Sequence, residues 1–472
     1  MQFKYAELIQ NRAIEFSRIM KTIEEVLVGD YSLVRIIRCG SLGNIMAPLK
    51  YAVVRAADGI IDYIKDELSQ VDLIDKQALN EKYPRLMNKG YLINLGVGLT
   101  YDEAVFRAIE GLLKRFYPLL YEAHVLKSGK YIFASEKELK KSGYDFVSVK
   151  DFIYYTPSQK RQLSLFKGYE EFNPDKRILW IHAENLINGK DYLVPAQCII
   201  SSYMKCVDEP VYRFASNHGI SLDIEEEKAI TRALMDDLTK DSFFVFWYSP
   251  AKLAANLSGH EKVILRELIG KFLPNTLTFY INCYKLLNEY GLKMYFSYFM
   301  SDENQLVAAI SCGISIFDAI LDCLLNLVRN IMLATYLESL NIPLSNEDLN
   351  DSIEHLIYYV RNTEMALEAS HKIKEKVQEE HITTELDIKF DLRELLKVLS
   401  DKEYVLKIRF PILTEKLHMI KIYVPKLCEP FIGVDQPFLC SNNVNAFPEE
   451  KQNTGSIENY SKEALPHPLY FF

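Results

Sequence analysis

The chain has 472 residues, of which 49% are apolar and 25% are charged, so its composition is that of an ordinary globular protein. This length suits one large domain or two to three smaller ones. Lysine and arginine number 55 against 64 aspartates and glutamates, which gives a net charge of -9, and no long basic run occurs. Because nucleic acids are bound largely through cationic contacts to phosphate, this balance argues against nucleic acid as a main partner.

Two stretches bear on location. The first residues, MQFKYAELIQNRAIEF, lack a basic segment followed by an apolar core, so we expect no signal peptide. Residues 306–328 are apolar enough to suggest a membrane span, but they contain Asp318 and Asp322 one helical turn apart. Each aspartate at mid-bilayer costs about 2.5–3.5 kcal/mol. We therefore expect a buried strand, turn and helix here, and no membrane partner.

The cysteines favour free thiols. No two of the eight stand at CxxC spacing: Cys39, Cys198, Cys206, Cys283, Cys312, Cys323, Cys428 and Cys440. Most lie in apolar surroundings, where a free cysteine behaves as a small hydrophobic residue. The pattern therefore argues against both a zinc site and a disulfide framework. Because disulfides are rare in reducing compartments, it favours a cytoplasmic protein.

One sequence pattern occurs three times. Each copy has a glycine, an acid-containing turn, and a helix with two small residues four positions apart, which share a helix face and let the helix pack closely. The copies are Gly98–Arg115 with Ala104 and Ala108, Gly219–Lys240 with Ala229 and Ala233, and Gly313–Asn330 with Ala319 and Cys323. The repetition predicts an α+β fold of related helix–strand layers. The alternative is that amphipathic helices look alike by chance.

Strand-like runs lie between the copies. The pair Asn188-Gly189 predicts a hairpin turn after a strand at Arg177–Leu186. The aromatic run Ser242–Tyr248 is interpreted as a further buried strand. Three more strands are predicted at 293–300, 404–410 and 419–425. Mixed or antiparallel sheets are expected from this arrangement.

Three segments flank or interrupt this pattern. Residues 1–90 are predicted to be a mostly helical N-terminal region and a candidate surface for a partner. Residues 345–381 are charged and helical, and Ser345 and Asp348 at their start have capping-box-like spacing, so a solvated pair of surface helices is expected. Residues 440–463 are polar and loop-like, and they lead to a proline-containing tail, residues 464–472.

Together these features resemble the YcaO family from about Gly96 to Phe472. The likeness is carried by the strand with Trp180 and its following VPA turn, by the loop Asn217-His218-Gly219, by IKIYVPKL, and by LPHPLY near the end. Each motif is short, whereas their order and spacing are fairly specific. The resemblance implies that residues 91–472 form a YcaO-like domain.

The resemblance also implies a chemistry. YcaO proteins bind ATP with magnesium in a cleft of an α+β fold and phosphorylate a backbone amide oxygen of a peptide after a nucleophile has attacked it. The nucleophile is a Cys, Ser or Thr side chain in azoline-forming members and sulfide in thioamide-forming members. Many act with a partner that grips the leader of a ribosomal peptide, and their proline-rich tail ends near the active site.

In this chain the residues at the family's metal-binding positions differ from those of the family. In the family they stand seven and ten residues after the first small residue of each helix, on one face, and magnesium requires oxygen ligands there. Position seven holds Gly111, Asp236 and Asn326, and position ten holds Lys114, Thr239 and Arg329. Asp236 is the one acid among the six and is therefore our metal-ligand candidate.

Phosphate contacts are predicted on the same units. Gly96-Val97-Gly98 follows an apolar run, and Thr100 with Glu103 has capping-box spacing, so N–H groups at this helix start would attract an anion. An ordinary tight turn explains these glycines equally simply. The nucleotide-binding candidates are Gly96, Gly98, Thr100, Arg115, Asn217, Lys240 and Arg329.

The tail supplies the catalytic candidates Pro466, His467 and Pro468. The family tail often has a further proline where this chain has Tyr470, so the alternative is that residues 469–472 only fill an apolar groove. His218 has two interpretations as well, a general base or a hydrogen-bonding turn residue.

Three interpretations of the altered site remain open. In the first, the nucleotide site is dead and the fold serves as a scaffold or peptide-binding subunit. In the second, the site is rearranged: Glu110 and Asp237 stand one residue from the expected positions, about 100° around the helix, and Lys114 or Arg329 holds phosphate directly. In the third, the alignment of the copies to the family has slipped. Whether the chain is an enzyme is left open by these alternatives.

We predict a divergent YcaO-like component of a ribosomal-peptide-modifying system that forms azolines or activates backbone amides in a related way with ATP and magnesium. The alternative is a non-catalytic scaffold or precursor-peptide-binding subunit paired with an active YcaO enzyme. A stand-alone ATP-using enzyme with another acceptor is a third option. The expected partners are a ribosomal precursor peptide and a leader-binding or second YcaO subunit, and homodimerisation is a further expectation.

Overall fold

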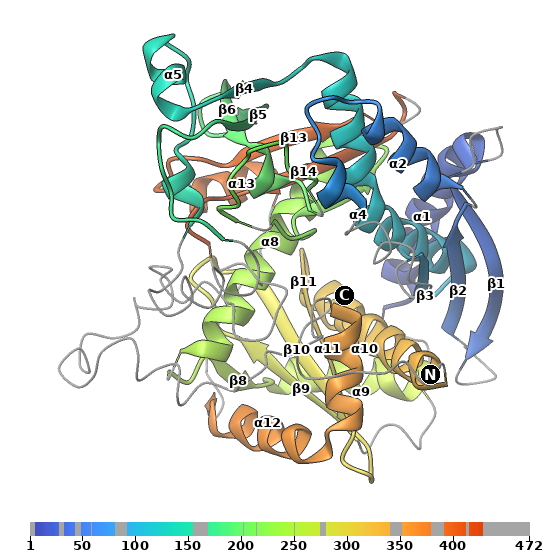
Figure 1. Cartoon of the computed structure of the whole chain (residues 1–472). Helices are drawn as coiled ribbons and strands as arrows, with labels where there is room; N and C mark the ends of the chain where they lie inside the picture. The colour runs from blue at the N-terminus through green and yellow to red at the C-terminus, as the bar shows by residue number, and fades with distance from the viewer. Residues whose placement is uncertain are drawn as a thin grey trace. The chain divides into compact units, whose positions relative to one another are not determined.

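The computed structural model describes residues 5–27, 33–42, 49–57, 59–80, 92–153, 169–201, 203–213, 215–249, 251–273, 280–339, 352–378, 391–411 and 415–427. These residues form two compact units, and Figure 1 colours them along the chain. The first unit takes described residues from Met1–Gly40, Lys50–Leu234 and Leu396–Lys426, and the second takes most of its described residues from Met235–Leu395. Helix α8 (Glu226–Tyr248) and helix α13 (Leu392–Val398) contribute to both.

The first unit is an α+β structure. Its remaining elements are, in chain order, α1 (Ala6–Leu27), β1 (Val34–Leu42), β2 (Leu49–Ala56), α2 (Ile60–Ser69), β3 (Ile93–Gly98), α4 (Tyr101–Ser128), β4 (Ile132–Ala134), α5 (Glu136–Lys141), the 3-10 helix η1 (Val149–Phe152), β5 (Ile178–Asn185), β6 (Lys190–Pro195), α7 (Ala196–Ile199), β7 (Ile220–Asp223), β13 (Leu406–Phe410) and β14 (His418–Tyr423).

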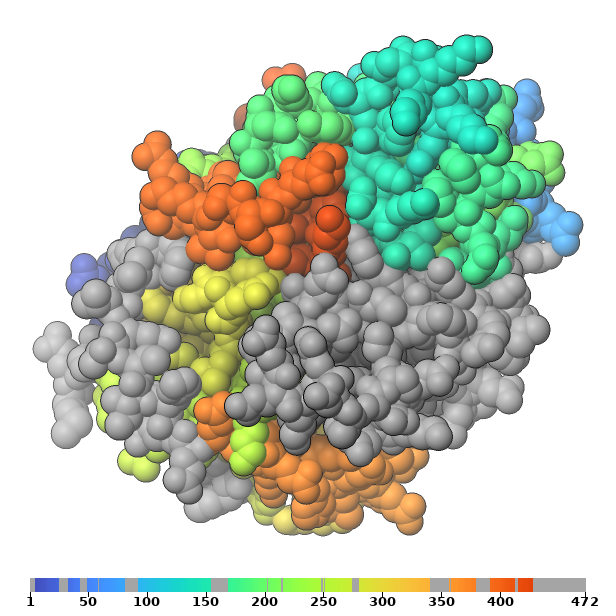
Figure 2. All heavy atoms as spheres, turned by 90° about the vertical axis from the view of Figure 1, so that its left-hand side faces the viewer, coloured from blue at the N-terminus to red at the C-terminus, as the bar shows by residue number. Residues whose placement is uncertain are grey.

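Two sheets organise this unit. One has the order β1-β2-β3, with β2 antiparallel to β3 from Lys50↔Gly98 to Arg55↔Ile93. The other has the order β4-β5-β13-β14-β7, and β6 pairs with β5 beside that path. Figure 2 shows the carboxyl-terminal residues of this unit, in orange, next to teal and green segments on one face. Within the sheet, β13 pairs antiparallel with β5.

A single apolar core joins the N-terminal elements to the rest of this unit. It includes Phe16 of α1, Val54 of β2, Ile64 of α2, Leu112 of α4 and Ile181 of β5. The prediction that residues 1–90 are mostly helical missed the strands β1 and β2. Because β2 pairs with β3 and shares this core, there is no boundary between separate cores near residue 90.

The second unit is built around one sheet. Its elements are β8 (Ala254–Asn256), α9 (Gly259–Phe272), β9 (Ile281–Leu286), β10 (Lys293–Met300), β11 (Leu306–Gly313), α10 (Ile316–Ser339), α11 (Ser352–Arg361), α12 (Thr363–Glu375) and β12 (Val377–Gln378), with the larger part of α8. The sheet order is β11-β10-β9-β8-β12, antiparallel except for the parallel pair β8–β12. The described sheets are thus mixed and antiparallel, as predicted.

Several local predictions are confirmed. Strands β5 and β6 form a hairpin with the pairing Asn185↔Lys190, and Gly189 takes the left-handed φ of 67° that its turn requires. Strands β10, β13 and β14 lie in the three later runs, and α11 and α12 in the charged segment. Residues 306–328 form β11 and the first part of α10. None of the helices in the described ranges has the length and apolar character needed to cross a membrane.

The aromatic run Ser242–Tyr248 is not a strand; it is the last part of α8. Phe243, Phe244, Phe246 and Trp247 are each at most 1% exposed. A segment that is buried on all sides has no helical periodicity, so its apolar run looks the same in a strand and in a helix. The chain has no glycine or proline between Glu226 and Tyr248, and the helix therefore continues through the run.

The first and third sequence copies have the same structure, and the second differs. Gly98 ends β3 before α4, and Gly313 ends β11 before α10. Gly219 instead stands before β7, with a φ of 66°, so the glycine of the second copy precedes its strand, whereas the glycines of the other two copies end theirs. The residue that stands six positions before Ala229 is Asp223, the last residue of β7.

Candidate functional site

The start of α4 binds a carboxylate of its own chain. Thr100 caps the helix, as predicted, with its hydroxyl accepting from the Glu103 N–H at 3.1 Å. The Glu103 carboxylate accepts from the Leu99 N–H at 2.9 Å and pairs with Arg12 at 2.7 Å and Arg107 at 3.1 Å. Glu103 is only 1% exposed. The favourable anion position at this helix end is therefore held by Glu103.

Gly96 and Gly98 lie against α4. A Cβ on Gly96 would stand 2.1 Å from the Ala104 carbonyl oxygen and 2.5 Å from the Ala108 nitrogen. A Cβ on Gly98 would stand 2.8 Å from the Ala104 nitrogen. Close packing of strand on helix thus explains both glycines without a ligand. Phosphate binding by this turn stays a prediction.

Arg115 is bonded to the strand beneath α4. Its guanidinium donates to the Ile93 carbonyl at 2.8 Å and to Asn94 Oδ1 at 3.1 Å, and the residue is 7% exposed. Asn94 in turn donates to the Ala108 carbonyl at 2.9 Å. A Cβ on Gly111 would meet the Asn94 side-chain nitrogen at 2.3 Å. The Asn94 amide therefore fills the space in which an acid at position seven of this helix would begin.

Glu110, one residue away, points to β7. Its carboxylate accepts from the Ser221 hydroxyl and from the Leu222 N–H, both at 3.1 Å, and lies 4.0 Å from Lys114 Nζ. Burial raises the pKa of Glu110, but the charges of Lys114 and Arg232 and these hydrogen bonds outweigh it and hold the pKa below 4.5. In the first unit Glu110 thus joins α4 to β7, and Lys114 pairs with it.

In the second unit the charges of two acids and one lysine act on Cys312 at the end of β11. Burial raises the pKa of the Cys312 thiol to about 12; the charges of Asp236 and Asp322 add to the rise, while Thr239 and Lys240 oppose it. The thiol lies 3.5 Å from the Met235 carbonyl oxygen. Because it stays protonated at neutral pH, Cys312 is no nucleophile there. The charges of two carboxylates, one on α8 and one on α10, thus act on the same thiol.

Arg329 lies on α10 in the same unit. Its guanidinium donates to Asn330 Oδ1 at 3.0 and 3.2 Å, and Asn330 donates to the Ala308 carbonyl of β11 at 2.8 Å. Asn326, at position seven of this copy, has its amide nitrogen 3.5 Å from the Ile310 carbonyl oxygen. Lys240 and Asp237 on α8 are 7% and 3% exposed.

The remaining candidates lie elsewhere. Asn217 is in the turn before β7 of the first unit, where the buried Lys421 ammonium donates to the carbonyls of Ser216 and His218. That bonding accounts for the loop as a structural turn. Pro466, His467 and Pro468 lie outside the described residues.

The structure thus groups the candidates by unit. Gly96, Gly98, Thr100 and Arg115 stay together on β3 and α4, and the charges of Asp236 and Lys240 both act on Cys312. Sequence reasoning did not select Asp322 as a site residue. The available signal was its place three residues after Ala319, where the first two copies have Arg107 and Arg232.

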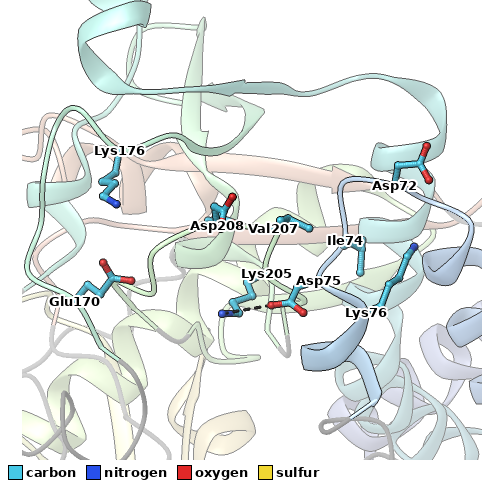
Figure 3. Close-up of a pocket in the computed structure, with 10 residues that line it drawn as sticks. Asp72, Ile74, Asp75, Lys76, Glu170, Lys176, Lys205, Val207 and Asp208 are labelled. Atoms are coloured by element: carbon cyan, nitrogen blue, oxygen red, sulfur yellow. Dashed lines mark ion pairs between the residues drawn. The ribbon is translucent and has the colours of Figure 1, made fainter.

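The first unit also has an open pocket of about 750 Å³ (Figure 3). None of the predicted nucleotide or metal residues lines it. Its charges partly satisfy one another, since Lys205 pairs with Asp75 at 3.5 Å and Lys76 donates to the Ser69 and Val71 carbonyls. Among the described residues, no group of three or more His, Cys, Asp and Glu side chains is placed to hold a metal ion.

One comparison with known proteins shows the family of this chain. A family model for YcaO cyclodehydratases that bind ATP and Mg2+ matches residues 95–428. No curated protein matches the chain by sequence.

Solved structures share the fold. A heterocyclase in complex with substrate and cofactor has a TM-score of 0.57 at 13% identity, over 87% of this chain and 52% of that one. This chain therefore spans about half the length of that heterocyclase. The YcaO protein of Methanopyrus kandleri bound with AMPPCP and Mg2+ has a TM-score of 0.52 at 11% identity, over 90% and 92% of the two chains. The E. coli microcin synthetase McbBCD complex with pro-MccB17 bound gives 0.51 at 14%, over 83% and 88%.

Proposed function

The chain belongs to the YcaO family, and we propose that it is a component of a ribosomal-peptide-modifying system that uses ATP and magnesium to activate a backbone amide for azoline formation or a related change. The family match over residues 95–428 carries this proposal. The heterocyclase structures support it through the shared fold. A ribosomal precursor peptide and a leader-binding or second YcaO subunit are the partners that this function requires.

We propose that residues of the second unit hold a magnesium–phosphate group. Magnesium is commonly bound by one or two protein carboxylates together with phosphate oxygens, and it offsets charge during phosphoryl transfer. Asp236 and Asp322 are two carboxylates and Lys240 is a cation whose charges all act on the Cys312 thiol. Arg329 on α10 is a second cation of this unit. In this proposal the two acids hold the metal and the two cations hold phosphate oxygens.

The residues of α4 do not fit a metal. Gly111 has no side chain and faces the Asn94 amide, Lys114 is cationic and Arg115 is bonded to β3. Glu110 is held by Ser221 and Leu222. We therefore assign no metal-binding role to α4 and propose that the acids of the second unit serve instead.

The test is isothermal calorimetry of ATP binding to the full chain, with and without magnesium. We expect magnesium-dependent binding that Asp236→Asn and Asp322→Asn each weaken by about tenfold or more, because each replaces a charged carboxylate ligand with a neutral amide. The matched control is Glu227→Gln, which removes an exposed acid from the first turn of α8 and should leave affinity unchanged. Full affinity in both aspartate variants would refute the proposed ligands.

The altered α4 face favours a second candidate, a non-catalytic scaffold or precursor-peptide-binding subunit. In this case the chain would bind no ATP up to millimolar concentration, with or without magnesium. It would instead co-purify with an acid-complete YcaO enzyme and increase that enzyme's modification of its precursor peptide. Failure of both ATP binding and co-purification would contradict both candidates.

A further inference from the structure

Strand β1 is an exposed sheet edge. In the order β1-β2-β3 it has β2 as its one strand neighbour among the described residues, and Figure 1 shows it at the outside of this small sheet. All five residues from Arg35 to Cys39 are exposed, and Ile36 and Ile37 each keep 53% of their surface open. Proteins usually shorten, cover or charge such edges, because an open strand pairs readily with another chain.

The side chains of this edge have a simple complement. Alternate residues of a strand point to opposite faces, so Arg35 and Ile37 share one face and Ile36 and Arg38 share the other. Each face therefore offers one apolar side chain and one cation. A neighbouring strand with the order acid, apolar, apolar, acid would place an opposite charge beside each arginine and an apolar side chain beside each isoleucine.

We propose that β1 is the docking edge for an extended acidic segment of a partner protein, which adds to the sheet beside β1. Backbone hydrogen bonds along the open edge supply affinity, and the alternating side chains supply selectivity. The two arginines select acidic partners, and they do so on a chain whose net charge is -9. The proposal concerns the N-terminal strand alone and is independent of nucleotide binding.

A second copy of this chain fits the edge less well. An antiparallel pair of β1 strands that matches Ile36 with Ile37 also places Arg35 opposite Arg38, and like charges directly opposite each other are destabilising. An acidic strand meets the same two isoleucines without that repulsion. The charge pattern therefore favours a different chain as the occupant.

The test uses the full chain and two fluorescein-labelled peptides, TSEVVETS and TSKVVKTS, followed by fluorescence anisotropy without ATP and with a reductant that keeps Cys39 a thiol. We expect saturable binding of the glutamate peptide and at least about fivefold weaker binding of the lysine peptide. The double variant Arg35→Glu/Arg38→Glu should reverse this preference. Reversal is a gain of binding, so it cannot result from misfolding.

The matched control is Lys140→Glu/Lys141→Glu, which makes the same charge change on the exposed last turn of α5 in the same unit. It should keep the wild-type preference. The proposal is overturned if neither peptide binds, or if Arg35→Glu/Arg38→Glu keeps the glutamate preference. It is also overturned if sedimentation velocity shows a wild-type dimer that this variant dissociates, since the edge would then join two copies.

Discussion

The strand–helix pairs β3–α4 and β11–α10 share the way their backbones pack but differ in the side chains on the helix face. In the first, Arg115 bonds the Ile93 carbonyl; in the second, Asn330 bonds the Ala308 carbonyl. Both donors stand eleven residues after the first alanine of the helix, and both acceptors stand five residues before the strand's last glycine. The two strand–helix pairs thus share a close approach of strand to helix and one hydrogen bond from a helix side chain to a strand carbonyl. Both features are kept although the other side chains on the helix face differ.

The difference lies at position seven. The first unit has Asn94 on the strand and Gly111 on the helix, whereas the second has Ala309 on the strand and Asn326 on the helix. The large side chain has changed sides. In the first unit the Asn94 amide therefore fills the space beside position seven, and in the second unit the helix has a side chain, Asn326, at that position.

The largest effect is expected from Gly96→Ala, which attacks the close approach itself. The added Cβ would meet backbone atoms of Ala104 and Ala108, which can move only with α4. We expect the free energy of unfolding to fall by about 3 kcal/mol in urea denaturation. Gly270→Ala in α9 is the control, because a Cβ there meets nothing within 4 Å; it should be neutral or stabilise by up to about 1 kcal/mol.

The same variant distinguishes packing from phosphate binding. If Gly96→Ala kept wild-type stability but lost affinity for ATP, the turn would be a phosphate site and its role in packing would be secondary.

A smaller effect should follow from moving the large side chain back. Gly111→Asn places a side chain where the Asn94 amide lies, so we expect a loss of about 2 kcal/mol of unfolding free energy. Adding Asn94→Ala reproduces the Ala309/Asn326 arrangement and should recover about half of that loss. A double-mutant cycle in urea measures the coupling. Strictly additive losses would mean that the two positions do not exchange volume.

These residues show how far the sequence could lead. The glycines and small helix residues predicted the layered α+β fold, because a close strand–helix approach restricts residue type at fixed spacing. The combination of a large side chain at Asn94 with no side chain at Gly111 could not be predicted, since the two residues are seventeen positions apart and meet only through the packing of β3 on α4. The aromatic end of α8 misled the prediction because full burial removes periodicity.

The candidate site followed the same division. Asp236 was selected because it is the one acid at the helix positions where the family resemblance places metal ligands. The effect of the Asp322 charge on the Cys312 thiol depends on the packing of α10 on β11, which a single sequence does not display. Arg115 was selected from its helix position too, but its hydrogen bonds to Ile93 and Asn94 join α4 to β3.

Removing the hydrogen bonds from Arg115 to Ile93 and from Asn330 to Ala308 tests whether both strand–helix pairs are stabilised in the same way. Arg115→Met and Asn330→Leu each leave a buried strand carbonyl without its donor, so each should lower the unfolding free energy by about 1.5 kcal/mol. Calorimetry should then show unchanged ATP affinity for Arg115→Met. A tenfold loss of affinity at preserved stability would return Arg115 to the nucleotide-binding set.

The smallest effect is expected at Glu110, where the first unit uses an acid for structure. Glu110→Gln keeps an oxygen that can accept from Ser221 and Leu222 but removes the attraction to Lys114 and Arg232, so we expect a loss of about 1 kcal/mol at pH 7.

The folded pKa of Glu110 lies below the unfolded value, so the folded state binds this proton less tightly. The contribution is therefore complete above about pH 4.5 and is lost as the pH falls through the folded pKa. Urea denaturation of both proteins from pH 7 to pH 3 should show their difference shrinking below pH 4.5. A difference that stays constant down to pH 3 would mean that the Glu110 charge contributes nothing, and that its two hydrogen bonds alone join α4 to β7.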